Sequence, residues 1–129
     1  MIIELTPETF FEYVNEEGPL HVVMHYGKSC GPCKMTIPNY ETLANHFEKE
    51  NFSNIKFYRF HHWEPEFKLF IRENNLGTKG VPTFRYYYFG EILHEDTHAY
   101  SDANTIKNVI VEVVKGIEVT MGGFPLYES

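Results

Sequence analysis

The chain has 129 residues, a formal net charge of −7, 43% hydrophobic residues and 22% charged residues. These values predict a single globular domain with one hydrophobic core. The acidic balance argues against binding to nucleic-acid phosphates or anionic membranes, and no apolar run is long enough to span a bilayer.

The N-terminal stretch MIIELTPETF lacks the basic start and long apolar run of a signal peptide. We therefore expect a cytoplasmic monomer in a reducing compartment, where a permanent disulfide is not expected.

The first half of the chain alternates between strand and helix patterns. Residues 2–5 predict a short strand, and Thr6-Pro7 predicts the start of a short helix, with Thr as N-cap and Pro at the first helical position. Residues 20–26 (LHVVMHY) are rich in β-branched and aromatic residues with little alternation, which predicts a strand buried on both faces. From Cys33 to about residue 50, apolar residues recur at helical spacing.

The second half continues the alternation. Residues 55–60 predict a strand and 65–74 a helix, and residues 83–89 and 91–97 predict an antiparallel hairpin around Gly90. Ser101 or Asp102 should cap a last helix that runs to Ile117. The order β-α-β-α-β-α-β-β-α predicts an α/β fold, with a mixed sheet and helices on both faces. We assign residues 1–117 to the domain and 118–129 to a flexible or edge extension.

The two cysteines of the chain, Cys30 and Cys33, lie two residues apart in KSCGPCKMTIP. Such a pair can bind a metal, form a static staple or cycle between dithiol and disulfide. A structural zinc site needs four ligands, and none of the histidines stands at a finger spacing from the pair. A staple across so short a loop removes little entropy from the unfolded chain. We therefore favour redox cycling without a metal.

The position of Cys30 favours a reactive thiolate. It follows a predicted strand and precedes a helix, so backbone N–H groups and the helix dipole should stabilise the sulfur anion. Lys28 and Lys34 flank the pair and favour the same charge. We expect Cys30 to be exposed and to act as the nucleophile. Cys33, one turn further along the helix, should be more buried and should resolve the mixed disulfide.

The dipeptide between the cysteines fits this arrangement. Gly31 leaves the approach to Cys30 open, and Pro32 restrains the loop at an early helical position where a missing N–H costs little.

The motifs CGPCK at 30–34, Pro38 and GVPT at 80–83 resemble the thioredoxin family, over roughly residues 1–116. The resemblance implies the thioredoxin fold and a cis Pro82 beside the dithiol. It also implies that the Val81 backbone pairs with an extended substrate segment. Tyr26 matches an aromatic position that packs near the active site in this family.

The resemblance further implies a disulfide reductase that acts on proteins. Its redox equivalents would reside in the Cys30–Cys33 pair, so no organic cofactor is needed, and a partner of the thioredoxin-reductase type would supply electrons.

Two residues depart from the family pattern. Ser29 stands where thioredoxins usually carry Trp, and Met24 falls where a buried acid usually lies beneath the dithiol. His25 should face the other side of its strand, as a hydrogen-bonded core residue rather than a base. These departures keep an alternative open, a thioredoxin-fold binding or adaptor module. Residues 61–63 (His-His-Trp) form either a partner-specific rim or, the interpretation we favour, an exposed loop.

Overall fold

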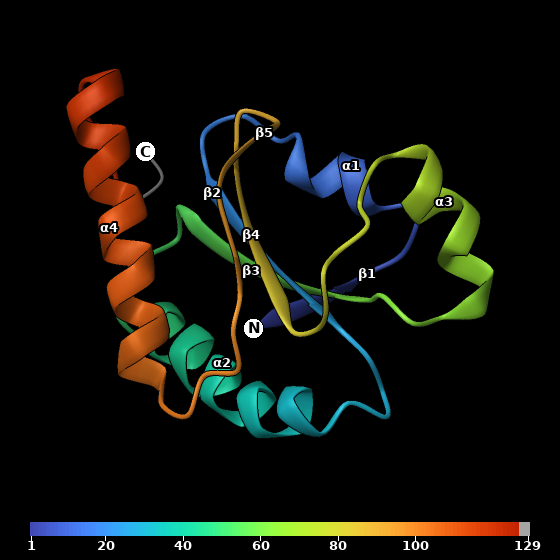
Figure 1. The fold of residues 1–129 in the computed structure, drawn as a ribbon. Helices are drawn as coiled ribbons and strands as arrows, with labels where there is room; N and C mark the ends of the chain where they lie inside the picture. Colours follow the sequence, from blue (N-terminus) through green and yellow to red (C-terminus); the bar gives the residue numbers. More distant parts are fainter. Residues whose placement is uncertain (127–129) are drawn as a thin grey trace.

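A five-stranded mixed sheet forms the centre of the structure, a computed structural model that describes residues 1–126 (Figure 1). The strands lie in the order β1-β3-β2-β4-β5. Their bounds are Ile2–Leu5 for β1, Leu20–Tyr26 for β2, Ile55–His61 for β3, Thr83–Tyr88 for β4 and Glu91–Thr97 for β5.

The pairing of the strands follows the predicted connections. β3 runs parallel to both β1 and β2, as expected for strands joined through helices, whereas β4 is antiparallel to β2 and to β5. The β4–β5 turn places Phe89 and Gly90 at φ values of 52° and 77°. Two successive left-handed residues are typical of the tight turns that join antiparallel strands.

Four helices cover the two faces of this sheet. Their bounds are Phe10–Val14 for α1, Gly31–Lys49 for α2, Lys68–Glu73 for α3 and Ala103–Met121 for α4, and a 3₁₀ turn at Pro65–Phe67 precedes α3. α2 and α4 lie on one face, and α1 and α3 on the other (Figure 1). The predicted α/β class and element order are thereby confirmed.

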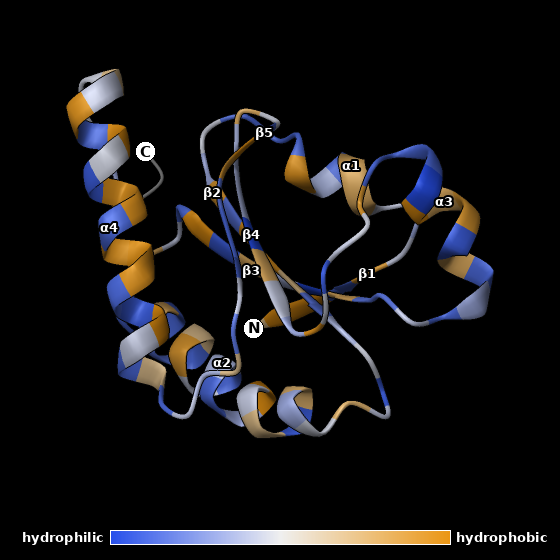
Figure 2. Cartoon of the chain, in the orientation of Figure 1, coloured by the Kyte–Doolittle hydropathy of each residue, from blue (hydrophilic) through white to orange (hydrophobic). Residues whose placement is uncertain are grey.

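β2 is the strand that links the two cores. All seven of its residues are buried, as its lack of polar–apolar alternation predicts, and they include His21 and His25. Leu20, Val22 and Met24 pack into the core beneath α2 and α4, while Val23 packs into the second core beneath α1 and α3. Figure 2 shows the corresponding bands of apolar residues on α2 and α4.

Three helix boundaries differ from the sequence prediction. α1 begins at Phe10, because Thr6 and Thr9 first form a turn in which the Thr6 amide donates to Thr9 Oγ1 over 3.0 Å. The predicted helix over 65–74 begins as a 3₁₀ turn. α2 begins at Gly31, two residues earlier than predicted, because Cys30 itself supplies the N-cap.

The C-terminal residues also differ from expectation. α4 continues past Ile117 to Met121, so residues 118–121 are helical, and Gly122 ends the helix at a φ of 83°. The chain then returns to the sheet, because the amide of Asn54 donates to the Leu126 carbonyl over 3.0 Å. Residues 122–126 include no strand, and the last three residues of the predicted extension lie outside the described part.

Candidate active site

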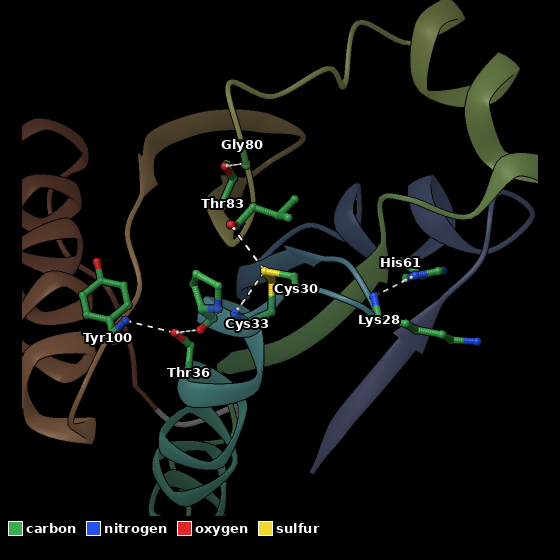
Figure 3. Close-up of a disulfide and its surroundings, with 10 residues drawn as sticks. Lys28, Cys30, Cys33, Thr36, His61, Gly80, Thr83 and Tyr100 are labelled. Carbon is green, nitrogen blue, oxygen red and sulfur yellow. Dashed lines mark hydrogen bonds between the residues drawn. A yellow bond between two sulfur atoms is a disulfide. The ribbon is translucent and has the colours of Figure 1, made fainter.

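The two cysteines lie where β2 passes into α2. Residues 27–30 form a turn between the strand and the helix, in which the Cys30 amide donates to the Gly27 carbonyl over 3.2 Å. Cys30 is the N-cap of α2 and has extended backbone angles, and the Cys33 amide donates to its Sγ over 3.1 Å (Figure 3). The predicted place of Cys30 at a helix N-terminus is confirmed. Its sulfur takes the role that a Ser or Asp oxygen usually has in a cap.

Cys30 and Cys33 are joined by a disulfide, and their Cα atoms lie 5.2 Å apart. Cys33 is fully buried, as expected. Cys30 is only 4% exposed, so the prediction of an exposed Cys30 is wrong for this oxidised form. The physical reason is its position between the first turn of α2 and the loop before β4. The residues between the cysteines, Gly31 and Pro32, are exposed.

The loop before β4 lies directly against the disulfide. The Val81–Pro82 peptide bond is cis, and Cys30 Sγ lies 3.6 Å from the Val81 carbonyl oxygen. Thr83 secures the loop, because its hydroxyl donates to the Gly80 carbonyl over 2.6 Å (Figure 3). Pro82 is buried and Val81 half-buried. The predicted meeting of GVPT with the dithiol, residues 51 positions apart, is confirmed.

A threonine that the sequence analysis did not single out anchors the first turn of α2. The Thr36 hydroxyl donates to the Pro32 carbonyl over 2.9 Å and accepts from the Tyr100 amide over 3.0 Å. The cysteine-bearing turn is thereby tied to the segment before α4 (Figure 3). The Pro32–Thr36 spacing of four residues is a local signal of the first bond, but no local pattern reveals Tyr100.

Position 24, where the family usually has a buried acid, is occupied by a methionine. Met24 is fully buried in the same core as Cys33. His25 faces the opposite core, as predicted, and its ring contacts Phe10 and Phe60. Its Nε2 lies 3.4 Å from Arg85 Nη1. Burial, with the nearby charge of Arg85, lowers the pKa of His25 well below its ordinary value, which suits a neutral core residue.

Tyr26 is buried in the core that contains both cysteines, and its hydroxyl reaches Glu4 on β1. That hydroxyl donates to the Glu4 carboxylate, at 3.0 Å from Oε2, and the Arg59 guanidinium lies over the ring. Burial and then the Glu4 charge raise the pKa of Tyr26 to about 12. Its polar group is therefore engaged with β1, and its ring lies beside the ring of His61, with 5.2 Å between the centroids.

Residues 61–63 make more contacts with the rest of the protein than the exposed-loop interpretation predicts. His61 and His62 are half-buried and Trp63 is 50% exposed. The His61 ring accepts a hydrogen bond from the Lys28 amide, two residues before Cys30. The exposed-loop interpretation is therefore wrong for the two histidines.

Within residues 1–126, no group of three or more His, Cys, Asp or Glu side chains is placed to hold a metal ion. Among the helices of this part, none is both long and apolar enough to cross a membrane. The chemistry that the geometry offers is that of two sulfur atoms at a helix N-terminus beside a cis-proline loop.

Such a site on a mixed sheet defines a thioredoxin-fold protein with a dithiol–disulfide centre, and comparisons agree. The Thioredoxin family model matches residues 1–112. The chloroplastic F-type thioredoxins of Mesembryanthemum crystallinum and Pisum sativum are 33% and 32% identical over 102 residues, 78% of this chain. Those residues cover 49% and 52% of the two proteins, so the chain spans about half the length of these curated relatives.

Solved structures give the same result. Thioredoxin f from spinach chloroplast (long form) superposes with a TM-score of 0.70 at 25% identity, covering 87% of this chain and 85% of that one. Chlamydomonas reinhardtii thioredoxin f2 gives 0.69 at 22% identity, covering 90% and 96%. The chain belongs to the thioredoxin family.

Proposed function

We propose that this chain is a dithiol–disulfide oxidoreductase that reduces disulfides of protein substrates. The observation that carries the proposal is the position of Cys30 Sγ. This sulfur accepts a hydrogen bond from the Cys33 amide at the start of α2 and lies 3.6 Å from the Val81 carbonyl oxygen of the cis-proline loop. The Cys30 sulfur thereby lies at the N-terminus of α2, bonded to Cys33 in the first turn and facing the backbone of Val81.

The proposed reaction begins with the reduced dithiol. The Cys30 thiolate attacks one sulfur of a substrate disulfide, a mixed disulfide forms, and the other substrate sulfur leaves as a thiolate. The Cys33 thiolate then attacks Cys30 Sγ and releases the second substrate thiolate. The substrate gains two electrons and the chain ends as the Cys30–Cys33 disulfide seen here. A reductase of the thioredoxin-reductase type returns the two electrons, so no organic cofactor is required.

The local electrostatics support Cys30 as nucleophile and Cys33 as resolving thiol. The hydrogen bond from the Cys33 N–H and the positive end of the 19-residue helix α2 favour a thiolate at Cys30. Lys28 and Lys34 are exposed on either side and favour the same anion. Cys33 is fully buried, so a bulky substrate disulfide meets Cys30 first.

The proposed substrate site lies around the cis-proline loop. The Val81 backbone would pair with an extended segment of the substrate, and Pro82 keeps that backbone beside the sulfur. Gly31 and Pro32 are exposed, so they leave the opposite side open. Tyr26 would contribute by supporting this surface from the core. We further propose that the chain works as a monomer in the cytoplasm, a reducing compartment in which the dithiol can be regenerated.

The test is reduction of insulin by dithiothreitol with catalytic amounts of the protein. We expect the parent to accelerate insulin precipitation and Cys30→Ser to reduce the rate to that of dithiothreitol alone. Equal activity of Cys30→Ser and the parent would remove this mechanism. If neither protein accelerates the reaction, the alternative of a binding or adaptor module takes its place.

The direction of electron flow is tested by equilibration with glutathione. We expect a reduction potential near the roughly −270 mV of a reducing thioredoxin, because Gly-Pro between the cysteines resembles the reducing members. A value near the roughly −120 mV of a strong oxidant would reverse the direction.

A further inference from the structure

The single tryptophan of the chain lies against the loop that precedes Cys30. The indole of Trp63 packs on Gly27 so closely that a Cβ atom added at Gly27 would overlap the ring carbons. Gly27 is buried and does not have a positive φ, so its backbone would accept any residue. The close approach of the indole, rather than backbone conformation, is what requires glycine here.

Two further contacts join the same pair of segments. The Lys28 amide donates to His61 Nε2 over 3.1 Å (Figure 3), and the His62 amide donates to the Tyr26 carbonyl over 2.7 Å. Because Nε2 accepts the hydrogen bond from the Lys28 amide, the ring proton of this tautomer is assigned to Nδ1, which lies 3.6 Å from Glu64 Oε2. Residues 61–63, which we call the clamp, thus hold residues 26–28 at three successive positions.

The held segment ends at Cys30. The carbonyl of Gly27, the residue under the indole, accepts the hydrogen bond from the Cys30 amide. Between them, Lys28 and Ser29 are exposed, and within residues 1–126 neither side chain makes a hydrogen bond. The clamp therefore supplies a hydrogen bond at Lys28 and ring packing at Gly27, immediately before the cysteines.

We propose that the clamp positions Cys30 for thiol–disulfide exchange, with His61 as hydrogen-bond acceptor and Trp63 as packing surface. This inference rests on the proposed function and assigns positioning residues to the same site. The reactive geometry depends on two contacts of Cys30 Sγ, 3.1 Å to the Cys33 amide and 3.6 Å to the Val81 carbonyl. A loop that loses its outside contacts samples other positions, and the sulfur spends less time near the helix N–H groups that stabilise its anion.

The first test measures the rate at which iodoacetamide alkylates Cys30 as a function of pH, in a Cys33→Ser background so that one thiol reacts. His61→Leu removes the acceptor, and His61→Gln keeps an acceptor oxygen at similar reach. We expect His61→Leu to lower the rate at pH 7 at least threefold and to raise the pH midpoint. His61→Gln should remain within twofold of the parent. Equal pH profiles for His61→Leu and the parent, or equal losses in both variants, would overturn the role of the acceptor.

The second test is a double-mutant cycle between Gly27 and Trp63, in the same Cys33→Ser background. Gly27→Ala forces the indole out, so it should lower the alkylation rate at least threefold in the presence of Trp63. In a Trp63→Ala background the same change should have less than a twofold effect. Gly77→Ala is the matched control, because a Cβ there meets nothing within 4 Å. Additive losses in the cycle would contradict the packing role.

Circular dichroism and thermal unfolding of each variant show whether it is folded at the assay temperature, so a rate is compared only between folded proteins. The readout uses no protein substrate, which separates the two proposals. If the parent fails to reduce insulin but the alkylation effects are found, the proposed function fails and the clamp stands. If insulin is reduced and the clamp variants alkylate like the parent, the clamp fails alone.

Discussion

The amide of Cys33 donates a hydrogen bond to the sulfur of Cys30 over 3.1 Å, and the same two residues form the disulfide. The donor belongs to the backbone, so it persists when the Cys33 side chain is changed. Substitutions at the two positions should therefore have different consequences.

Cys33→Ser should trap the mixed disulfide between Cys30 and a substrate. The variant retains the attacking thiol and the N–H donor but lacks the sulfur that releases the substrate. We expect a covalent adduct with a disulfide-containing protein, visible by non-reducing electrophoresis and mass spectrometry and removed by dithiothreitol. The Cys30→Ser variant serves as the control and should form at least tenfold less adduct. Equal trapping by both variants would show that Cys33 also attacks substrates directly.

Tyr40→Phe should destabilise the protein without changing its redox chemistry. The fully buried hydroxyl lies 2.9 Å from the Val22 carbonyl and 2.8 Å from the Tyr58 carbonyl, and it accepts from the Tyr58 amide over 3.2 Å. Its loss leaves buried backbone groups of β2 and β3 without this partner. We expect the free energy of unfolding to fall by about 1–3 kcal/mol in urea titrations.

A matched control for this prediction is Tyr13→Phe, since the half-buried Tyr13 hydroxyl has no hydrogen bond among residues 1–126. That change should alter the free energy of unfolding by less than about 0.5 kcal/mol. A similar loss in both variants would mean that the bridge between β2 and β3 contributes nothing specific.

Stability should decrease as the pH falls below about 6.5, the ordinary pKa of histidine in an unfolded chain. Burial and the charge of Arg85 lower the pKa of folded His25, and burial also lowers the pKa values of His21 and His62. Below that pH the unfolded chain binds protons that the folded protein does not. Each such histidine then costs up to about 1.4 kcal/mol per pH unit, until the pH reaches its folded pKa.

His25→Phe should make this pH dependence shallower, because one of the three histidines no longer titrates on unfolding. The measurement is the free energy of unfolding in urea at several pH values between 7.5 and 5.5. A parent whose stability is constant over this range would contradict the neutral, buried state of His25.

Met24→Asp should lower the stability of the protein and speed the release of the substrate from the mixed disulfide. The position is fully buried in the core that contains Cys33, so an ionised carboxylate there should lower the free energy of unfolding at pH 7 by at least about 2 kcal/mol. Burial raises the pKa of the new acid, so the folded state binds the extra proton and the loss should shrink as the pH falls toward 4. A base near Cys33 should also speed its attack on the mixed disulfide, measured by stopped-flow decay of that species.

Met24→Leu is the control for this experiment, because it conserves volume and adds no charge. It should change stability by less than about 1.5 kcal/mol and leave the decay rate unaltered. Loss of stability in Met24→Asp without faster decay would show that resolution does not depend on a base at this position.

Local sequence was sufficient for the framework of the fold. The sequence of β2, rich in β-branched and aromatic residues with little alternation, predicted a strand buried on both faces, because a strand between two cores has no solvent-facing side. The Ser29-Cys30-Gly31-Pro32 stretch likewise predicted a cysteine at a helix N-terminus, since capping depends on a few neighbouring residues.

Features that depend on distant residues were not accessible in this way. The sequence placed the end of α4 at Ile117, where the apolar stripe ends, but the helix continues to Met121 and ends at Gly122, after which the Leu126 carbonyl accepts from the Asn54 amide. Residues 61–63 carried no recognisable pattern, because their partners lie more than thirty positions earlier. The requirement for glycine at position 27 could not be predicted from the local sequence either, since the indole that excludes a side chain belongs to Trp63 in another loop.

The sequence by itself determined the class of fold and the place of the two cysteines at the start of a helix, because these follow from periodicity and spacing. The proline opposite them was indicated by the resemblance to the thioredoxin family. Only the tertiary structure decided that Cys30 is covered in the oxidised form, that Thr36 ties the first turn of α2 to Tyr100, and that residues 61–63 contact the cysteine loop. The exposure of a side chain and the contacts it makes depend on all of its neighbours in space, and most of those neighbours are remote along the chain.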